Sequence, residues 1–334
     1  MSVKEADGSM LLSRIAECVY WSARYMERVE ATARLVKVQT ELFLDLPRSV
    51  RMGWSPLLAI TGTKDEYLDR HTADTEEPAT EDTVITFLTV DAEHHGSIVA
   101  SLARARHNLR ITRSLFPRSA WEEVNELFLW ATDTGAEAVD RRTRVEWMNG
   151  VIRRCHLLAG LTASTMLHDD LYSFVEMGRF VERADMTTRV LDVQAHILLR
   201  DGQGKLQPYT DVTWIGVLRA LDASRALRRV AGLATSGADA LRFLLKDPQF
   251  PRSVEHCLNQ VSRSLLELPR HEEPMAGCAA VQKVLEDVDV AGLSGDGLHQ
   301  VASDLQDGLA DLHDLVTETY FSVTRSDSAI LALR

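Results

Sequence analysis

Cysteines and long apolar runs are scarce in this chain of 334 residues. The four cysteines are Cys18, Cys155, Cys257 and Cys278, and no two have the C-x-x-C spacing of a zinc site or redox pair. Because a disulfide framework is not expected in a chain of this size, we expect reduced, buried thiols. No stretch approaches the roughly 20 apolar residues of a membrane-spanning helix, and the first nine residues do not resemble a secretory signal. We therefore expect a cytoplasmic protein without a membrane partner.

Basic residues are outnumbered, since 37 Lys and Arg face 49 Asp and Glu, which gives a net charge of −12. Such a chain is repelled by polyanions, so nucleic acid is not an expected partner. The hydrophobic fraction of 45% and the charged fraction of 26% are ordinary for a globular protein rather than a disordered one.

Sequence signatures of common catalytic sites are missing as well. The chain has no G-x-S-x-G elbow and no glycine loop that would cradle a phosphate, so no cofactor is expected. Residues 91–95 and 168–170 carry Asp, Glu and His. A di-iron bundle, however, needs a Glu-x-x-His motif on each of two helices, and the motif does not occur. We interpret these segments as loop and helix-cap residues and predict no metal site.

The periodicity of apolar residues predicts an all-α fold. One apolar stripe runs through residues 12–43 and ends before Pro47, and a second runs through residues 169–199 before the Gly202-Gln203-Gly204 turn. Shorter helices are expected at residues 97–115, 120–138, 145–166, 253–268, 273–290 and 298–323. With further short helices, we expect about ten to twelve in total. Loops are expected at residues 63–81, 201–211, 247–252 and 292–297.

The sequence also repeats itself. A shift of 155 positions aligns Glu27 with Glu182, together with seven neighbouring pairs of identical or similar residues on the two long helices. A shift of 160 aligns Trp54 with Trp214, and a shift of 156 aligns a block that includes Ser97 and Ser253. Duplication of one helical unit explains three blocks in the same order. We therefore predict two tandem diverged repeats of a helical bundle, at residues 10–160 and 165–323. They should form one compact unit in which the long helices meet about a pseudo-twofold axis.

The repeated block carries an unusual set of charges on each long helix. The candidate residues are Arg24, Glu27, Arg28, Glu30 and Arg34 in the first copy, and Arg179, Glu182, Arg183, Asp185 and Arg189 in the second. Glu27 stands on the shoulder of the apolar stripe, so its carboxylate is expected to be partly buried and to need a partner. Helical spacing predicts intrahelical pairs of Arg24 with Glu27, Glu30 with Arg34, and their equivalents in the second copy.

Three interpretations of these clusters are open. They could form a structural ion-pair network where the repeats meet. They could instead bind an anion, because paired arginines hold a carboxylate or phosphate bidentately. They could also be exposed ion pairs of little consequence.

Three segments give the chain its family resemblance. Residues 178–193, which begin Gly178-Arg179-Phe180-Val181-Glu182-Arg183, and residues 12–35 resemble the alpha-E domain family, bacterial helical proteins named for an "ER" motif. Residues 153–161 resemble the family's middle segment, and the resemblance extends from about residue 10 to residue 320. Ala23 and Val29 depart from the family pattern that Gly178 and Ala184 follow, which suggests slightly wider helix spacing in the first half.

The resemblance implies a setting rather than a reaction. Members of this family resemble accessory partners of circularly permuted ATP-grasp amide ligases, and transglutaminase-like cysteine peptidases are common neighbours. It implies a non-catalytic protein that binds a ligase in a peptide synthesis or modification system. The alternatives are an enzyme of amide-bond formation or cleavage that uses the Glu-Arg clusters, and a structural homodimer scaffold. We assign no catalytic residue.

Overall fold

The computed structural model describes residues 13–45, 53–71, 79–200, 210–232, 236–293 and 295–322, and every regular element within these ranges is helical. The all-α prediction is therefore confirmed. The α-helices are α1 (Ser13–Asp45), α2 (Ser55–Ile60), α3 (Lys64–His71), α4 (Glu81–Thr89), α5 (Ile98–Ile111), α6 (Arg118–Asp133), α7 (Gly135–Val139), α8 (Arg144–Thr165), α9 (Asp170–Arg200), α10 (Thr210–Ala220), α11 (Ser224–Ala231), α12 (Gly237–Lys246), α13 (Val254–Leu266), α14 (Glu272–Asp287) and α15 (Gly295–Val316). Two short elements, η2 (Val290–Gly292) and η3 (Thr317–Phe321), flank α15.

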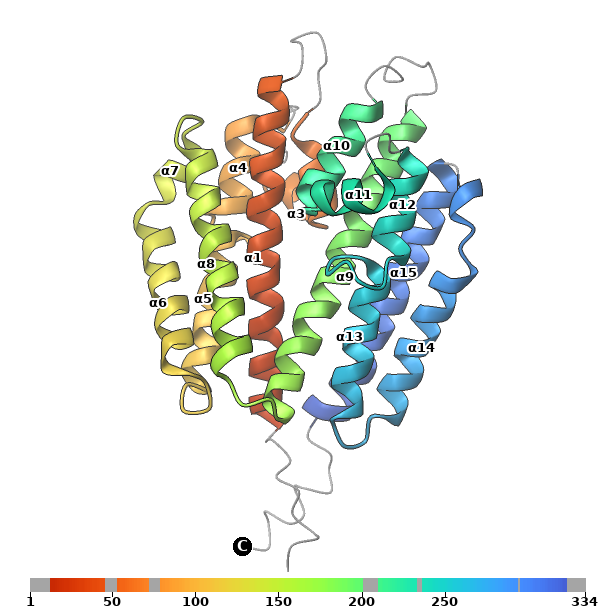
Figure 1. Cartoon of the computed structure of the whole chain (residues 1–334). Coiled ribbons are helices and arrows are strands. Elements are labelled where there is room, and N and C mark those ends of the chain that lie inside the picture. The colour runs from red at the N-terminus through yellow and green to blue at the C-terminus, as the bar shows by residue number, and fades with distance from the viewer. Residues whose placement is uncertain are drawn as a thin grey trace, which may run out of the picture.

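The two longest helices, α1 and α9, lie in the middle of the molecule and pack against each other (Figure 1). Helices α5 and α8 pack on α1, and α6 packs on both of them. On the other side α13 and α15 pack on α9, and α14 packs on both of those. The long helices therefore meet at the centre, as expected, and each is enclosed by three further helices.

Several boundaries differ from the sequence prediction. Fifteen α-helices occur in the described ranges, more than expected, because short helices such as α3 and α7 have too few turns to show a stripe. The expected loop at residues 63–81 contains α3, and α15 begins within the expected loop at residues 292–297. Residues 201–209 of another expected loop lie outside the described ranges.

The helix starts follow ordinary capping chemistry. Asp169 Oδ1 accepts the N–H groups of Leu171 and Tyr172 at the start of α9, which confirms its interpretation as a cap residue. Ser97 and Ser253 cap α5 and α13 in the same way. All four cysteines are free and buried, as predicted. No helix in the described ranges is long and apolar enough to cross a bilayer.

Gly178 lies where the backbone of α9 passes close to that of α1. A Cβ atom at this position would stand 2.4 Å from the backbone oxygen of Tyr20 and 3.3 Å from the Cβ of Ala23. Only glycine lets the two backbones approach this closely. This contact holds α1 and α9 near enough for side chains on either side of it to bridge them.

We expect Gly178→Ala to lower the free energy of unfolding by about 1–3 kcal/mol, because the added methyl group must push the helices apart. Gly160→Ala is the matched control. It lies in α8 with no atom within 4 Å of the added Cβ, so helix propensity should leave stability unchanged or raise it by up to about 1 kcal/mol. Urea unfolding followed by circular dichroism measures both. Equal effects of the two substitutions would contradict the close contact.

Candidate functional site

Two reciprocal ion pairs join the long helices. Arg28 of α1 donates from Nε to Glu182 Oε1 at 2.6 Å and from Nη2 to Oε2 at 3.1 Å. Arg183 of α9 donates from Nε to Glu27 Oε1 at 2.6 Å and from Nη2 to Oε2 at 2.9 Å. In each pair the same guanidinium atoms meet the same carboxylate atoms. The glutamate of each Glu-Arg dipeptide therefore binds the arginine of the other.

Each of the two carboxylates accepts a third hydrogen bond, and the arginine that donates it differs between them. Arg24 on α1 donates from Nε to Glu182 Oε2 at 2.7 Å, while its guanidinium lies 5.0 Å from the ring centroid of Trp21. Glu27 instead accepts from Nη1 of Arg252 at 3.0 Å, and Arg252 lies in the loop that precedes α13. The two Glu-Arg pairs between the helices are thus equivalent, whereas the third donor is Arg24 for Glu182 and Arg252 for Glu27.

Glu30 extends the network beside Glu27. It accepts from Arg252 Nη2 at 2.6 Å, from Arg34 one turn later on α1, and from His156 Nε2 of α8 at 2.9 Å. Arg34 also lies 3.5 Å from Asp222 in the turn between α10 and α11. This cluster therefore ties α1 to three other segments.

The charges fix the ionisation of the two carboxyl groups. Burial alone would raise the pKa of Glu182, but the guanidiniums of Arg28 and Arg24 outweigh it and lower the pKa from 4.5 to about 2. Burial likewise opposes the charged form of Glu30, and Arg252, His156 and Arg34 together hold its pKa well below the ordinary value. At neutral pH both are carboxylates held by cations.

All ten predicted residues lie on α1 or α9, but not every predicted pairing forms. The pairs Glu30–Arg34 and Asp185–Arg189 (2.9 Å) confirm the helical-spacing argument. The pairs Arg24–Glu27 and Arg179–Glu182 were wrong, because both glutamates face the opposite long helix.

Arg179 has other partners. It donates to Glu176 at 2.5 Å and to Thr162 at 3.3 Å. Helical spacing on one chain segment cannot reveal which side faces a neighbouring helix, so Glu182 was assigned to the wrong arginine.

Arg252 and His156 are network residues that sequence reasoning missed. At the shift of 156, Arg252 aligns with Gly96, so no charged residue at the equivalent position marked it as part of the charged block. His156 falls in the segment 153–161 that resembles the family, but nothing in its sequence position indicates that it binds Glu30. The two missed residues lie far from Glu30 in sequence, and only the fold brings them to it.

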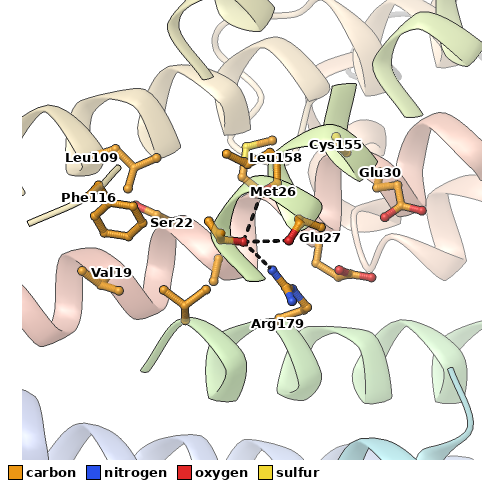
Figure 2. Close-up of a pocket in the computed structure, with 14 residues that line it drawn as sticks. Val19, Ser22, Met26, Glu27, Glu30, Leu109, Phe116, Cys155, Leu158 and Arg179 are labelled. Atoms are coloured by element: carbon orange, nitrogen blue, oxygen red, sulfur yellow. Dashed lines mark hydrogen bonds between the residues drawn. The ribbon is translucent and has the colours of Figure 1, made fainter. Parts of the chain in front are cut away.

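A cavity of about 50 Å³ adjoins the network between α1, α5, α8 and α9. Figure 2 shows Glu27 and Glu30 along one side and Arg179 reaching in from α9, with Val19, Leu109 and Phe116 at the apolar end. Substrate pockets are typically about 300–1,000 Å³, so this one has room for water rather than a substrate. Among the described residues no group of three or more His, Cys, Asp or Glu is arranged to hold a metal ion.

The comparisons with known proteins agree on a family and give no activity. The family model Alpha-E, described as a predicted alpha-helical domain with a conserved ER motif, matches residues 11–321. An uncharacterised protein of Mycobacterium bovis and two of Mycobacterium tuberculosis strains are each 24% identical over 345 residues. The match covers 93% of this chain and 37% of each relative, so the chain spans little more than a third of their length. No solved structure matches it.

We expect Glu182→Gln to lower the free energy of unfolding by about 3–5 kcal/mol, because it leaves the buried guanidinium of Arg24 and the half-buried guanidinium of Arg28 without their anion. Glu122→Gln is the matched control, since Glu122 pairs with Arg118 on α6 at side-chain exposures of 49% and 90%. That change should cost about 0–1 kcal/mol. Denaturant titration compares the two. A stable Glu182→Gln protein would exclude the structural network and favour the anion site.

The lowered pKa of Glu182 also predicts a pH dependence. Its carboxylate stabilises the fold fully above pH 4.5, the ordinary value, and this contribution disappears as the pH falls toward about 2. The wild-type protein should therefore lose more stability between pH 5 and 2 than Glu182→Gln does. Thermal unfolding across this range tests it, and parallel curves for the two proteins would contradict the assignment.

Proposed function

Since this chain belongs to the Alpha-E family, we propose that it is a non-catalytic helical accessory protein that binds an ATP-grasp-type amide ligase in the cytoplasm. The partner is taken from the family resemblance. The burial and the ion pairs of the Glu-Arg cluster support the non-catalytic role. A transglutaminase-like peptidase of the same system is a second candidate partner on the same ground.

The state of Glu182 carries this proposal. Its side chain is 1% exposed, and three N–H groups of Arg24 and Arg28 occupy its two oxygens. A general acid or base works best with a pKa near the operating pH and within reach of substrate. A buried carboxylate with a pKa of about 2 meets neither condition, so the Glu-Arg cluster favours a structural clamp over an acid–base site.

We further propose that the chain arose by duplication of one helical unit, with repeats at residues 10–160 and 165–323. The reciprocal pairs of Arg28 with Glu182 and Arg183 with Glu27 support it. Two loops with equivalent hydrogen bonds also support the duplication. Ser97 Oγ donates to the carbonyl of Asp91, as Ser253 Oγ does to that of Asp247.

Two turns give the same support at the shift of 160. The N–H of Thr63 binds the carbonyl of Leu58, and the N–H of Ala223 binds that of Leu218. The residue before each has a positive φ, 68° at Gly62 and 53° at Asp222. A positive φ is uncommon for a residue other than glycine, so its occurrence at Asp222 is notable. The same backbone geometry in both turns is expected if the two units are copies of each other.

The greater length of the mycobacterial relatives is consistent with a role beside another protein domain. The curated mycobacterial proteins devote 63% of their length to sequence outside the match, which leaves room for further domains joined to this one. A helical unit that works beside another protein can be joined to it covalently, because a linker raises the effective concentration of the two.

An enzyme and a homodimer scaffold are the alternatives. The enzyme hypothesis requires Glu27 or Glu182 to exchange a proton. It is contradicted if a protein carrying both Glu27→Gln and Glu182→Gln restores full function to cells that lack the native chain. The homodimer hypothesis predicts twice the mass of 37.3 kDa in light scattering of the purified chain.

We expect the chain to elute together with a circularly permuted ATP-grasp ligase encoded beside it when the two purified proteins are mixed on a gel-filtration column. Glu122→Gln protein should bind equally well, because this exposed pair contributes at most about 1 kcal/mol to the stability of the fold. The same ligase assayed with and without the chain shows whether binding changes its rate. Separate elution at micromolar concentrations of both proteins would exclude the partnership.

A further inference from the structure

A much larger cavity lies on the other side of the central helices. It has a volume of about 340 Å³ and lies between α1, α9, the turn before α3 and the loop before α5. This is the size of a small-molecule pocket. Its polar lining includes Thr32, Glu66, His94, Arg104, Asp185 and Arg189.

The equivalent place in the other repeat is filled by an arginine. There Arg252 reaches over Glu27 and Glu30 and donates to both. The repeat aligns Arg252 with Gly96, which has no side chain and lines the cavity. Asp185, the counterpart of Glu30, pairs with one cation, Arg189, within the described part of the chain. The cavity therefore has an anion where a guanidinium is missing.

The cavity also lacks an anion that the other repeat has. Arg34 lies beside the carboxylate of Asp222, and the repeat aligns these two residues with Arg189 and Gly62. Arg189 does point at that turn, because its Nη1 lies 2.7 Å from where a Cβ of Gly62 would be. No carboxylate can extend from glycine, so Arg189 faces the cavity where its counterpart Arg34 faces an aspartate.

Two buried polar atoms at the cavity have no partner among the described residues: Thr32 Oγ1 and His94 Nε2. Both residues are 1% exposed. Thr187, the counterpart of Thr32, donates to the carbonyls of Arg183 and Arg252. His94 Nδ1 lies 3.0 Å from both oxygens of Glu66, so it carries the proton and leaves Nε2 as an acceptor. A buried polar group without a partner is costly, and a ligand in the cavity would supply a partner for each of these two atoms.

We propose that this cavity binds a small zwitterion, with a guanidinium or ammonium group toward Asp185, Thr32 and His94 and a carboxylate toward Arg189. The ligand supplies the two charges that Arg252 and Asp222 supply in the other repeat. This proposal rests on the duplication argued above and is independent of the ligase. A basic amino acid has the required groups, so L-arginine is the probe.

Isothermal titration calorimetry of the full chain compares three compounds. L-Arginine has both charges, agmatine lacks the carboxylate, and L-citrulline has a neutral urea in place of the guanidinium. We expect L-arginine to bind at millimolar or lower concentration and each of the other two to bind at least about tenfold more weakly. No heat from L-arginine, or equal affinity for all three, would overturn the proposal. Ligase binding, measured separately, does not affect this outcome.

Thr32→Val and Thr187→Val form a matched pair of variants. Thr32→Val removes a hydroxyl that has no partner in the free protein, so the melting temperature should hold or rise while L-arginine binds about tenfold more weakly. Thr187→Val removes a bonded hydroxyl, so the melting temperature should fall while the affinity is unchanged. Equal effects of the two variants on affinity would refute the site.

Gly62→Asp tests the carboxylate end independently. Asp222 shows that aspartate adopts this backbone conformation, and the group that a new Cβ would displace is the flexible end of Arg189. The new carboxylate should pair with Arg189 as Asp222 does with Arg34. L-Arginine should then bind no better than agmatine, and a variant that still prefers L-arginine would contradict the assignment.

Discussion

The fold depends on two glutamates that are buried between two helices and bound by arginines. Removing a carboxylate from water costs several kcal/mol, and only cations placed at hydrogen-bonding distance offset that cost. Glu182 and Glu27 each meet an arginine of the opposite helix through two N–H groups, so neither helix can slide along the other without exposing a charge to an apolar surrounding. The ion pairs therefore set the register, while the apolar stripes supply most of the attraction.

Much of this architecture could be predicted from the sequence. The long stripes of α1 and α9 gave the helical class and the central pair, because a periodicity of three and four residues persists over many turns. The repeated charges marked the ten candidate residues on these helices. The pairs within one helix, Glu30–Arg34 and Asp185–Arg189, could also be predicted. The pairs between the helices could not, because Arg24 has the right spacing for Glu27 on its own helix and yet binds Glu182 on the other.

The residues that were missed share one property: each contacts a partner on another segment of the chain. Arg252 and His156 reach Glu30 from a loop and from α8. His94 was interpreted as a loop residue, and it does lie in a loop, but its ring is buried and stacked 3.8 Å from Phe87. Sequence patterns report the environment along one segment, whereas these side chains owe their environment to another.

The reciprocity of the Glu-Arg dipeptides has a consequence for how such a molecule could begin. A surface in which residue i binds residue j and j binds i is isologous, the kind that joins identical subunits about a twofold axis. A single ancestral unit carrying one dipeptide could bind its own copy through the contact that α1 and α9 make here. Joining two copies in one chain makes that association independent of concentration. After joining, the two copies can also change independently of each other. One copy can then carry an arginine, as at Arg252, where the other carries a glycine, as at Gly96.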